Sequence, residues 1–326
     1  MKEIQYKKYL KNLKYLALIL LSYFFMVWLL RSGLLTRQYR SLIVPIGVNI
    51  ILAVSLNLVT GFLGELSLGH AGFMSIGAYT GALISLHLKT LPAPAAFAAA
   101  LICGGITAAI FGFLIGVPVL RLRGDYLAIV TLAFGEIIKS IINALGFTGG
   151  AKGLNKIPLY SDYKNFNLVF LLTILSVILI VNLVNSRSGR AITAIRDNYI
   201  AAESIGLNIS EHKVRAFVIA AFFSGIAGVI YAHNVGIIKP STFDYNKSIE
   251  ILVIVVLGGM GSITGSVIAA ILLTVLPEFL RGADNYRLFL YAVVLIVMMI
   301  FNNSRMKQSL MNNKVFARLL GEGKEG

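Results

Sequence analysis

The chain has 326 residues, of which 57% are hydrophobic and only 13% are charged, and its mean hydropathy is +0.83. A water-soluble core cannot bury so much apolar surface, so the composition excludes a soluble globular protein and predicts an integral membrane protein. The net charge of +15 does not indicate nucleic-acid binding, because the basic residues gather at the ends of apolar runs, where membrane topology places them.

Ten apolar segments are predicted to span the membrane, because most of them approach the helix length needed to cross a hydrocarbon core of about 30 Å. The first lacks a small-residue cleavage site and is predicted to be an uncleaved anchor. The predicted fold is an all-α polytopic membrane protein with a single transmembrane domain over residues 1–326. The segments are 13–30, 42–60, 71–88, 92–117, 126–145, 166–185, 214–235, 248–258, 263–280 and 288–302.

Basic residues at both ends of the chain predict that both termini are cytoplasmic. An even number of spans agrees, because it returns the chain to the side from which it started. Residues 1–12, 186–213 and 303–326 are then cytoplasmic, whereas the Gly- and Lys-rich loop 146–164 is external. The charge bias is modest, since three arginines within 31–40 fall on the external side, so charge supports the placement of the first two spans least of all.

Two glycine-rich sequences interrupt the apolar runs, one at 61–72 and one at 258–266. Because there is one in each half of the chain, they predict two distantly similar halves. Unwound backbone at membrane depth must be buried in protein or line a cavity, which favours a translocation pathway over helix-packing glycines or ordinary turns. The candidate pathway residues are Gly64, Glu65, Ser67, His70, Gly258, Gly259, Gly261 and Ser262.

Ionisable residues in or near apolar runs carry a functional hypothesis, because hydrocarbon disfavours them unless they face a cavity or a partner. For Glu65 and His70, a pathway or gate role and a structural hydrogen bond to unwound backbone stay equally open. Glu136 is expected to pair with Lys139 three residues further on, and Glu250 is expected to form an interface ion pair.

The chain shows no phosphate-binding loop, no zinc-protease motif, no hydrolase nucleophile motif and no Cys/His cluster with metal-ligand spacing. Its four histidines are scattered. We therefore expect no enzymatic activity, no cofactor and no metal in this chain, and any energy for its function must come from elsewhere.

The longest polar interruption, 186–215, lies between two apolar runs and is predicted to be cytoplasmic. Its small residues describe a short helix that turns sharply at Gly206, a shape suited to docking into a groove on another protein. The arginines of the turn 121–126 either anchor the membrane edge or complement an acidic partner. The candidate coupling residues are Arg196, Asp197, Ala201, Ala202, Gly206 and Leu207.

Four sequence blocks, at 57–79, 121–139, 186–208 and 257–270, resemble in the same order the M-type permease of ABC importers for branched-chain amino acids. The resemblance covers roughly residues 42–302. It implies a bacterial or archaeal inner-membrane complex with a second, commonly different, permease subunit and two cytoplasmic ATP-binding subunits. It also implies an extracytoplasmic protein that delivers leucine, isoleucine or valine, contact with membrane lipid, and no nucleic acid.

The family's cytoplasmic loop carries an E-A-A-x-x-x-G pattern whose helix docks on the ATPase. Ala201, Ala202 and Gly206 match this pattern, but Ile200 stands at the glutamate position, which removes one polar contact. By resemblance, the helix from Asp197 to Leu207 acts as a lever that the ATPases move. Two alternatives remain: a urea or short-chain amide permease of the same family, and an ion-driven secondary transporter, for which Glu65 alone is weak support.

Overall fold

The computed structural model describes residues 21–280 except 29, 31, 33–35, 89 and 123, together with residues 292, 293 and 296. All regular elements in this part of the chain are helical, and one isolated β-bridge joins Leu154 to Ile238. The elements are α2 (Arg37–Ser41), α3 (Ile43–Asn57), the π-helical η1 (Leu58–Phe62), α4 (His70–His87), α5 (Ala93–Val119), α6 (Asp125–Ala144), η2 (Gly146–Thr148), η3 (Gly150–Lys152), η4 (Tyr163–Asn165), α7 (Phe166–Asn185), α8 (Arg187–Asp197), α9 (Tyr199–Ser204), α10 (Ile209–Val235), η5 (Pro240–Phe243), α11 (Tyr245–Gly258) and α12 (Ile263–Phe279).

Five helices of the described part are long and apolar enough to cross a membrane. The chain is therefore a multi-pass membrane protein, as its composition predicts. These helices are Gln38–Phe62, Ala93–Val119, Asp125–Ala144, Phe166–Asn185 and Ile209–Val235.

The eight predicted spans from 42–60 to 263–280 each correspond to a helix, three of them being α4, α11 and α12. The last of these, α12, is apolar but shorter than the five long helices. The predicted span 13–30 lies only partly within the described residues, of which 21–28 are helical. The span 288–302, apart from 292, 293 and 296, and the terminal segments 1–12 and 303–326 lie outside them. The count of ten spans and the two similar halves thus stay predictions.

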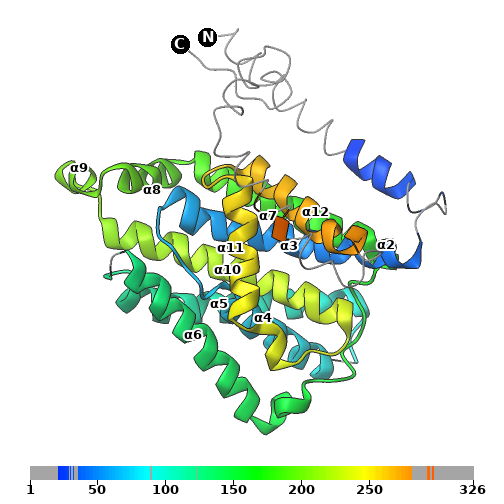
Figure 1. Cartoon of the computed structure of the whole chain (residues 1–326). Coiled ribbons are helices and arrows are strands. Elements are labelled where there is room, and N and C mark those ends of the chain that lie inside the picture. The colour runs from blue at the N-terminus through cyan, green and yellow to red at the C-terminus, as the bar shows by residue number, and fades with distance from the viewer. Residues whose placement is uncertain are drawn as a thin grey trace.

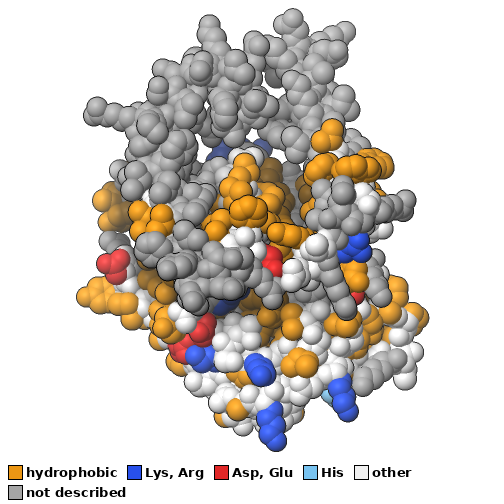
Figure 2. All heavy atoms as spheres, turned by 45° about the vertical axis from the view of Figure 1, so that its right-hand side comes forward, with side chains coloured by type: hydrophobic (Ala, Val, Ile, Leu, Met, Phe, Trp, Pro, Cys, Tyr) orange, Lys and Arg blue, Asp and Glu red, His pale blue; other side chains and the backbone are white. Residues whose placement is uncertain are grey.

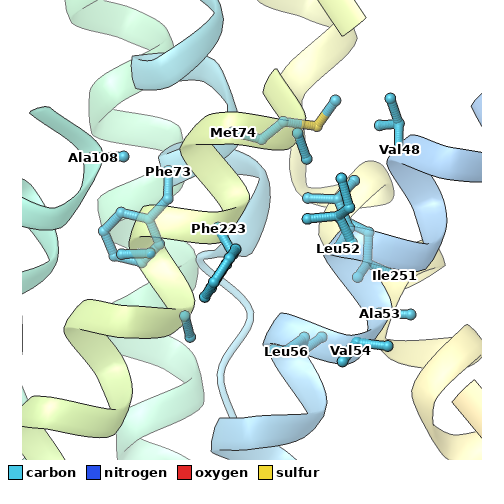
Figure 3. Packing of buried hydrophobic residues seen from close by; sticks show 14 of the residues in the cluster. Val48, Leu52, Ala53, Val54, Leu56, Phe73, Met74, Ala108, Phe223 and Ile251 are labelled. Atoms are coloured by element: carbon cyan, nitrogen blue, oxygen red, sulfur yellow. The ribbon is translucent and has the colours of Figure 1, made fainter. Parts of the chain in front are cut away.

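The core is built around α10, which packs against α5, α4 and α3, while α4 and α5 also pack against each other (Figures 1 and 3). Phe73 and Met74 of α4, Phe223 of α10 and Leu52 of α3 are buried in one hydrophobic cluster. Lipid tails are as apolar as these side chains, so tight packing has to supply much of the attraction between the helices.

Bare glycine backbone allows α4 to approach α10 and α5 closely. An ideal Cβ built on Gly104 of α5 would lie only 2.9 Å from the carbonyl oxygen of Gly77 in α4. One built on Gly225 of α10 would lie 2.7 Å from the carbonyl oxygen of Gly104. A Cβ on Gly81 would meet the side chain of Val229 at 2.6 Å. Small residues therefore create this three-helix contact, as they do in other membrane bundles.

The outward faces of the long helices are apolar. Ile102 and Phe113 on α5 and Leu171 on α7 are each more than half exposed. Figure 2 shows hydrophobic side chains in patches over the visible face, with charged side chains scattered among them. Such a surface is suited to contact with lipid or with another membrane subunit.

The long polar loops lie at opposite ends of α10. The segment 145–165 packs on its C-terminal end, where Leu154 and Ile238 exchange backbone hydrogen bonds of 2.9 and 3.1 Å and the Tyr160 ring stacks on His233 at 5.4 Å. The other end carries α8 and α9, which project beyond the bundle at the left of Figure 1. This arrangement agrees with the predicted topology, in which the two loops face different sides of the membrane.

Helix α10 begins at Ile209, five residues before the predicted span. The side chain of Asn208 accepts a hydrogen bond from the backbone N–H of Glu211 at 3.2 Å and so caps the helix in the polar region. Hydropathy could not locate this start, because the first turns of α10 are polar.

Candidate functional site

The first glycine-rich sequence breaks a helix. Helix α3 continues into η1, which ends at Phe62, residues 63–69 are unwound, and α4 starts at His70. Gly64 adopts a φ of +81°, in the left-handed region that favours glycine. The prediction of a broken helix is thus confirmed for this segment.

Hydroxyl groups from four helices satisfy the polar groups where α4 begins. Because backbone in the interior of a membrane protein has no water to bond, such partners are required. His70 is buried and binds α3 through its ring and α10 through its carbonyl group. The bonds are Leu68 N to Thr131 Oγ1 (3.0 Å), Ala71 N to Ser248 Oγ (3.1 Å), Ser224 Oγ to His70 O (2.9 Å) and Ser55 Oγ with His70 Nε2 (2.9 Å).

The second glycine-rich sequence forms the tight turn between α11 and α12. Gly259 and Gly261 have φ values of +90° and +83°. Helix α12 then starts with the side chain of Ser262 accepting from Gly265 N at 3.2 Å. Gly258 lies so close to Gly265 that an ideal Cβ there would be 2.6 Å from the Gly265 carbonyl carbon.

The two breaks meet in space through Asn57, the last residue of α3, which is fully buried. Its Oδ1 accepts from Gly261 N at 2.8 Å. Its Nδ2 donates to Ser262 O at 3.0 Å and to Ser266 Oγ at 2.9 Å. Gly61 lies against the backbone of Gly261 so closely that a Cβ would overlap it. We call Asn57, Gly61, Gly261 and Ser262 the glycine junction.

Arg196, the penultimate residue of α8, connects the polar loop to the glycine junction. Its Nη1 donates to the carbonyl oxygen of Gly61 at 2.9 Å. Its Nε and Nη2 donate to Oδ1 of Asp197 at 3.1 and 2.9 Å. The structure thus brings a predicted coupling residue into contact with the region of the predicted pathway glycines.

Glu65 and Lys213 form an ion pair between the unwound segment and the first turns of α10. Both side chains are only 13% exposed, so the pair is largely withdrawn from solvent. Glu65 is among the candidate residues predicted from the sequence, whereas Lys213 is not. Asn57 was not predicted either, although a polar residue near the end of an apolar run is a signal that could have indicated it.

The polar loop folds into two short helices, α8 and α9, which are separated at Asn198. The side chain of Asn198 accepts from Ile200 N and Ala201 N, both at 3.1 Å, and caps α9. At the C-terminal end of α9, Gly206 has a φ of +84° and forms a left-handed turn. The N–H of Leu207 donates to Ala202 O at 3.1 Å and closes the helix.

The side chains in and next to α9 differ in exposure. Ala202 is buried, whereas Ile200 and Ile205, the residue that follows the helix, are 63% and 75% exposed. Ile200 is the residue at the family's glutamate position, and its side chain lies on the open surface of the loop.

A cavity of about 870 Å³ lies between the unwound segment, the turn at 120–125 and the polar loop. Its lining carries six charged residues of both signs and therefore provides a polar compartment at this end of the molecule. Gly64 and Glu65 reach it, whereas Ser67 and His70 are buried. The charged lining residues are Glu65, Arg121, Asp125, Arg196, Glu203 and Lys213.

The other two candidate carboxylates, Glu136 and Glu250, also form ion pairs. Glu136 forms an ion pair with Lys139 at 2.5 Å and also accepts from Tyr245 N at 3.1 Å, at the start of α11. Glu250 pairs with Lys247 at 3.0 Å. Both carboxylates therefore have structural partners.

Apolar helices around two broken segments, with a polar helical loop projecting from one end, are typical of a multi-pass membrane transport protein. Residues 39–301 match the family described as "branched-chain amino acid transport system / permease component", and the chain belongs to this family. None of the solved structures matches the chain significantly.

Two relatives are named "high-affinity branched-chain amino acid transport system permease protein LivM". The one from Escherichia coli (strain K12) is 39% identical over 286 residues, and the one from Salmonella typhimurium is 38% identical over 286 residues. Each match covers 78% of this chain and 66% of the relative, slightly under two thirds of its length. The permease protein BraD of Pseudomonas aeruginosa is 28% identical over 262 residues, which cover 72% of this chain and 82% of that protein.

Proposed function

We propose that this chain is the permease subunit of an ABC importer that moves leucine, isoleucine and valine across the inner membrane of a bacterium or archaeon. The observation that carries this proposal is the match of residues 39–301 to the permease family of branched-chain amino acid transport systems. The hydrogen bond from Arg196 to Gly61 adds structural support, because it joins a projecting polar loop to the place where two broken helices meet. Family membership and the names of the two relatives with 38–39% identity support the substrate class.

The proposed complex contains a second, different permease subunit, two cytoplasmic ATP-binding subunits and an extracytoplasmic substrate-binding protein, surrounded by membrane lipid. Within this chain we propose ten spans in two distantly similar halves, with both termini in the cytoplasm. ATP hydrolysis belongs to the partner subunits, so this chain acts as a transport subunit and not as an enzyme.

In this proposal α9 docks on an ATP-binding subunit. The exposed apolar side chains of Ile200 and Ile205, at the polar end of a membrane protein, support a protein contact there. The residues predicted to couple the two subunits are Arg196, Asp197, Ala201, Ala202, Gly206 and Leu207. Closure of the ATP-binding subunits would move α8 and α9 together against the rest of the bundle.

We also propose that the broken helices border the translocation pathway. Unwound segments in membrane transporters occur where backbone is buried in protein or lines a cavity, and residues 63–69 satisfy this condition. The cavity of about 870 Å³ next to Glu65 supports an opening toward the cytoplasm. The pathway residues remain those named from the sequence: Gly64, Glu65, Ser67, His70, Gly258, Gly259, Gly261 and Ser262.

Reconstitution with the partner subunits in proteoliposomes tests this function. We expect uptake of radiolabelled leucine that requires ATP inside the vesicles and the binding protein outside, with competition by isoleucine and valine and none by urea. Competition by urea but not by valine would assign the chain to the amide permeases of the family. Uptake driven by an ion gradient without ATP would overturn the ABC assignment.

A further inference from the structure

We propose that Arg196 is a positioning residue that caps the broken helix at the glycine junction, so that the polar loop acts on both glycine breaks through this one side chain. This inference rests on the proposed function, because it specifies how the movement of α8 and α9 reaches the pathway. In this view, movement of α8 withdraws the guanidinium group and releases the two breaks together.

The side chain of Arg196 lies across glycines from both breaks. Its Cγ is 2.6 Å from the position of an ideal Cβ on Gly64, so only a glycine leaves room for it there. Its Nη1 donates to Gly61 O and lies 3.4 Å from the position of an ideal Cβ on Gly261. Arg196 is thus in close contact with the first break and next to the second, although Gly261 is far from Gly61 and Gly64 in the sequence.

The carbonyl group of Gly61 is a suitable partner for a cation. It belongs to the last turn of η1, and the end of a helix leaves carbonyl groups without an intrahelical N–H partner. The negative end of the helix dipole also lies there and favours a positive charge. Helix α11 ends at Gly258, beside the same junction. The C-terminal ends of two helices therefore converge near one guanidinium group.

Asp197 fixes the direction in which the guanidinium group points. It accepts from Nε and Nη2, which leaves Nη1 directed to Gly61. A planar group with several fixed donors can make these bonds at once, which a lysine ammonium on a flexible chain does less well. The rigid attachment of α8 supports the same geometry, because Ile192 and Ile195 on this helix are buried in the core.

The first test removes the guanidinium group in the assembled transporter. We expect Arg196→Gln to copurify with the ATP-binding subunits and to hydrolyse ATP, but to use about tenfold more ATP for each leucine imported, as loss of a hydrogen bond to a charged group allows. Arg187→Gln is the matched control, because it removes the same charge from an exposed position on the same helix. Its ratio of ATP to leucine should stay at the wild-type value.

Two outcomes would overturn the proposal while leaving the import function intact. One is an unchanged ratio in Arg196→Gln. The other is the joint loss of copurification and ATP hydrolysis, which would assign Arg196 to docking. A wild-type transporter that imports no leucine would instead reject the proposed function itself.

The second test is independent of the first, because it keeps the guanidinium group of Arg196 and displaces its stem. Gly64→Ala pushes a methyl group against the arginine stem, and Gly124→Ala is its control. Both glycines have a positive φ, of +81° and +61°, but a Cβ on Gly124 meets nothing within 4 Å. We expect only Gly64→Ala to raise the amount of ATP used for each leucine imported. Equal effects of both variants would contradict the proposal that Arg196 caps the broken helix.

Discussion

The Glu65 carboxylate and the Lys213 ammonium pair across 148 positions of sequence and fasten the unwound segment to the first turns of α10. Because both groups are largely buried, removal of one charge leaves the other without its partner, which costs more than replacement of both. The pair therefore links the first glycine break to the helix that follows the polar loop.

Replacing Glu65 by Gln should lower the free energy of unfolding by about 2 kcal/mol, because Lys213 is left as a partly buried unpaired charge. The double variant Glu65→Gln with Lys213→Met should recover part of this loss. Thermal unfolding in detergent measures both values, and simple additivity of the two single effects would contradict a direct interaction. Uptake kinetics of Glu65→Gln also test the pathway: an unchanged rate would give this residue a structural role only.

Replacing Asn57 by Leu should lower the free energy of unfolding by about 3 kcal/mol, because Gly261 N and Ser266 Oγ would lose buried hydrogen-bond partners. Asn185→Leu is the control, since that amide is exposed at the end of α7 and bonds only within its own helix. Unfolding followed by circular dichroism compares the two variants. Equal stabilities would show that the junction does not depend on Asn57.

Replacing Gly206 by Val should uncouple ATP hydrolysis from uptake while the protein stays inserted in the membrane. A Cβ at this position meets nothing within 4 Å, so the cost comes from the φ of +84°, at about 1–2 kcal/mol, and falls on the turn after α9. Gly146→Val, in open space at the opposite end, should have little effect. Normal leucine uptake by Gly206→Val would refute the coupling role of this turn.

Replacing Gly77 by Leu should prevent the close contact of α4 with α10. Its Cβ would overlap the backbone of Gly225, and no flexible side chain is available to give way. We expect a loss of more than about 3 kcal/mol and little folded protein, measured by the monodisperse yield in size-exclusion chromatography. Gly135→Ala in α6 should fold normally, because the nearest atom to its Cβ lies 3.9 Å away.

Single cysteines should distinguish the two ends of α10 by their accessibility from each side of the membrane. In a Cys103→Ala background, Ile205→Cys and Phe147→Cys both place a thiol at an exposed position. A membrane-impermeant maleimide should label Phe147→Cys in intact cells but reach Ile205→Cys only in inverted vesicles. Labelling of Ile205→Cys from outside would reverse the proposed orientation and remove the polar loop from the ATP-binding subunits.

Local sequence was sufficient to predict the helical spans within the described residues, the two glycine breaks and the sharp turn at Gly206. These features depend on apolar length, on glycine and on capping residues that lie within a few positions of one another. The pairing of Glu136 with Lys139 is of the same kind, because the two residues share one helical turn.

The connections of the site were not predictable from the same signals. Asn57 bonds to residues more than 200 positions away, and Lys213 and Arg196 reach partners 148 and 135 positions away. Helical periodicity carries no information about such contacts. The hydrogen bonds of Ser55, Ser224 and Thr131 were also not predictable, because a single serine or threonine hardly lowers the mean hydropathy of an apolar helix.

Helix α10 runs without a break from the cap at Asn208 to Gly236, a length of roughly 40 Å for its 27 residues. One of its ends follows the polar loop, and the other is bonded to the segment around Leu154 and Ile157. In the proposed importer, a stiff helix fixed at both surfaces would transmit the arrival of the substrate-binding protein at one face to the ATP-binding subunits at the other, without any helix melting. Substrate loading and ATP hydrolysis would in this way be synchronised mechanically.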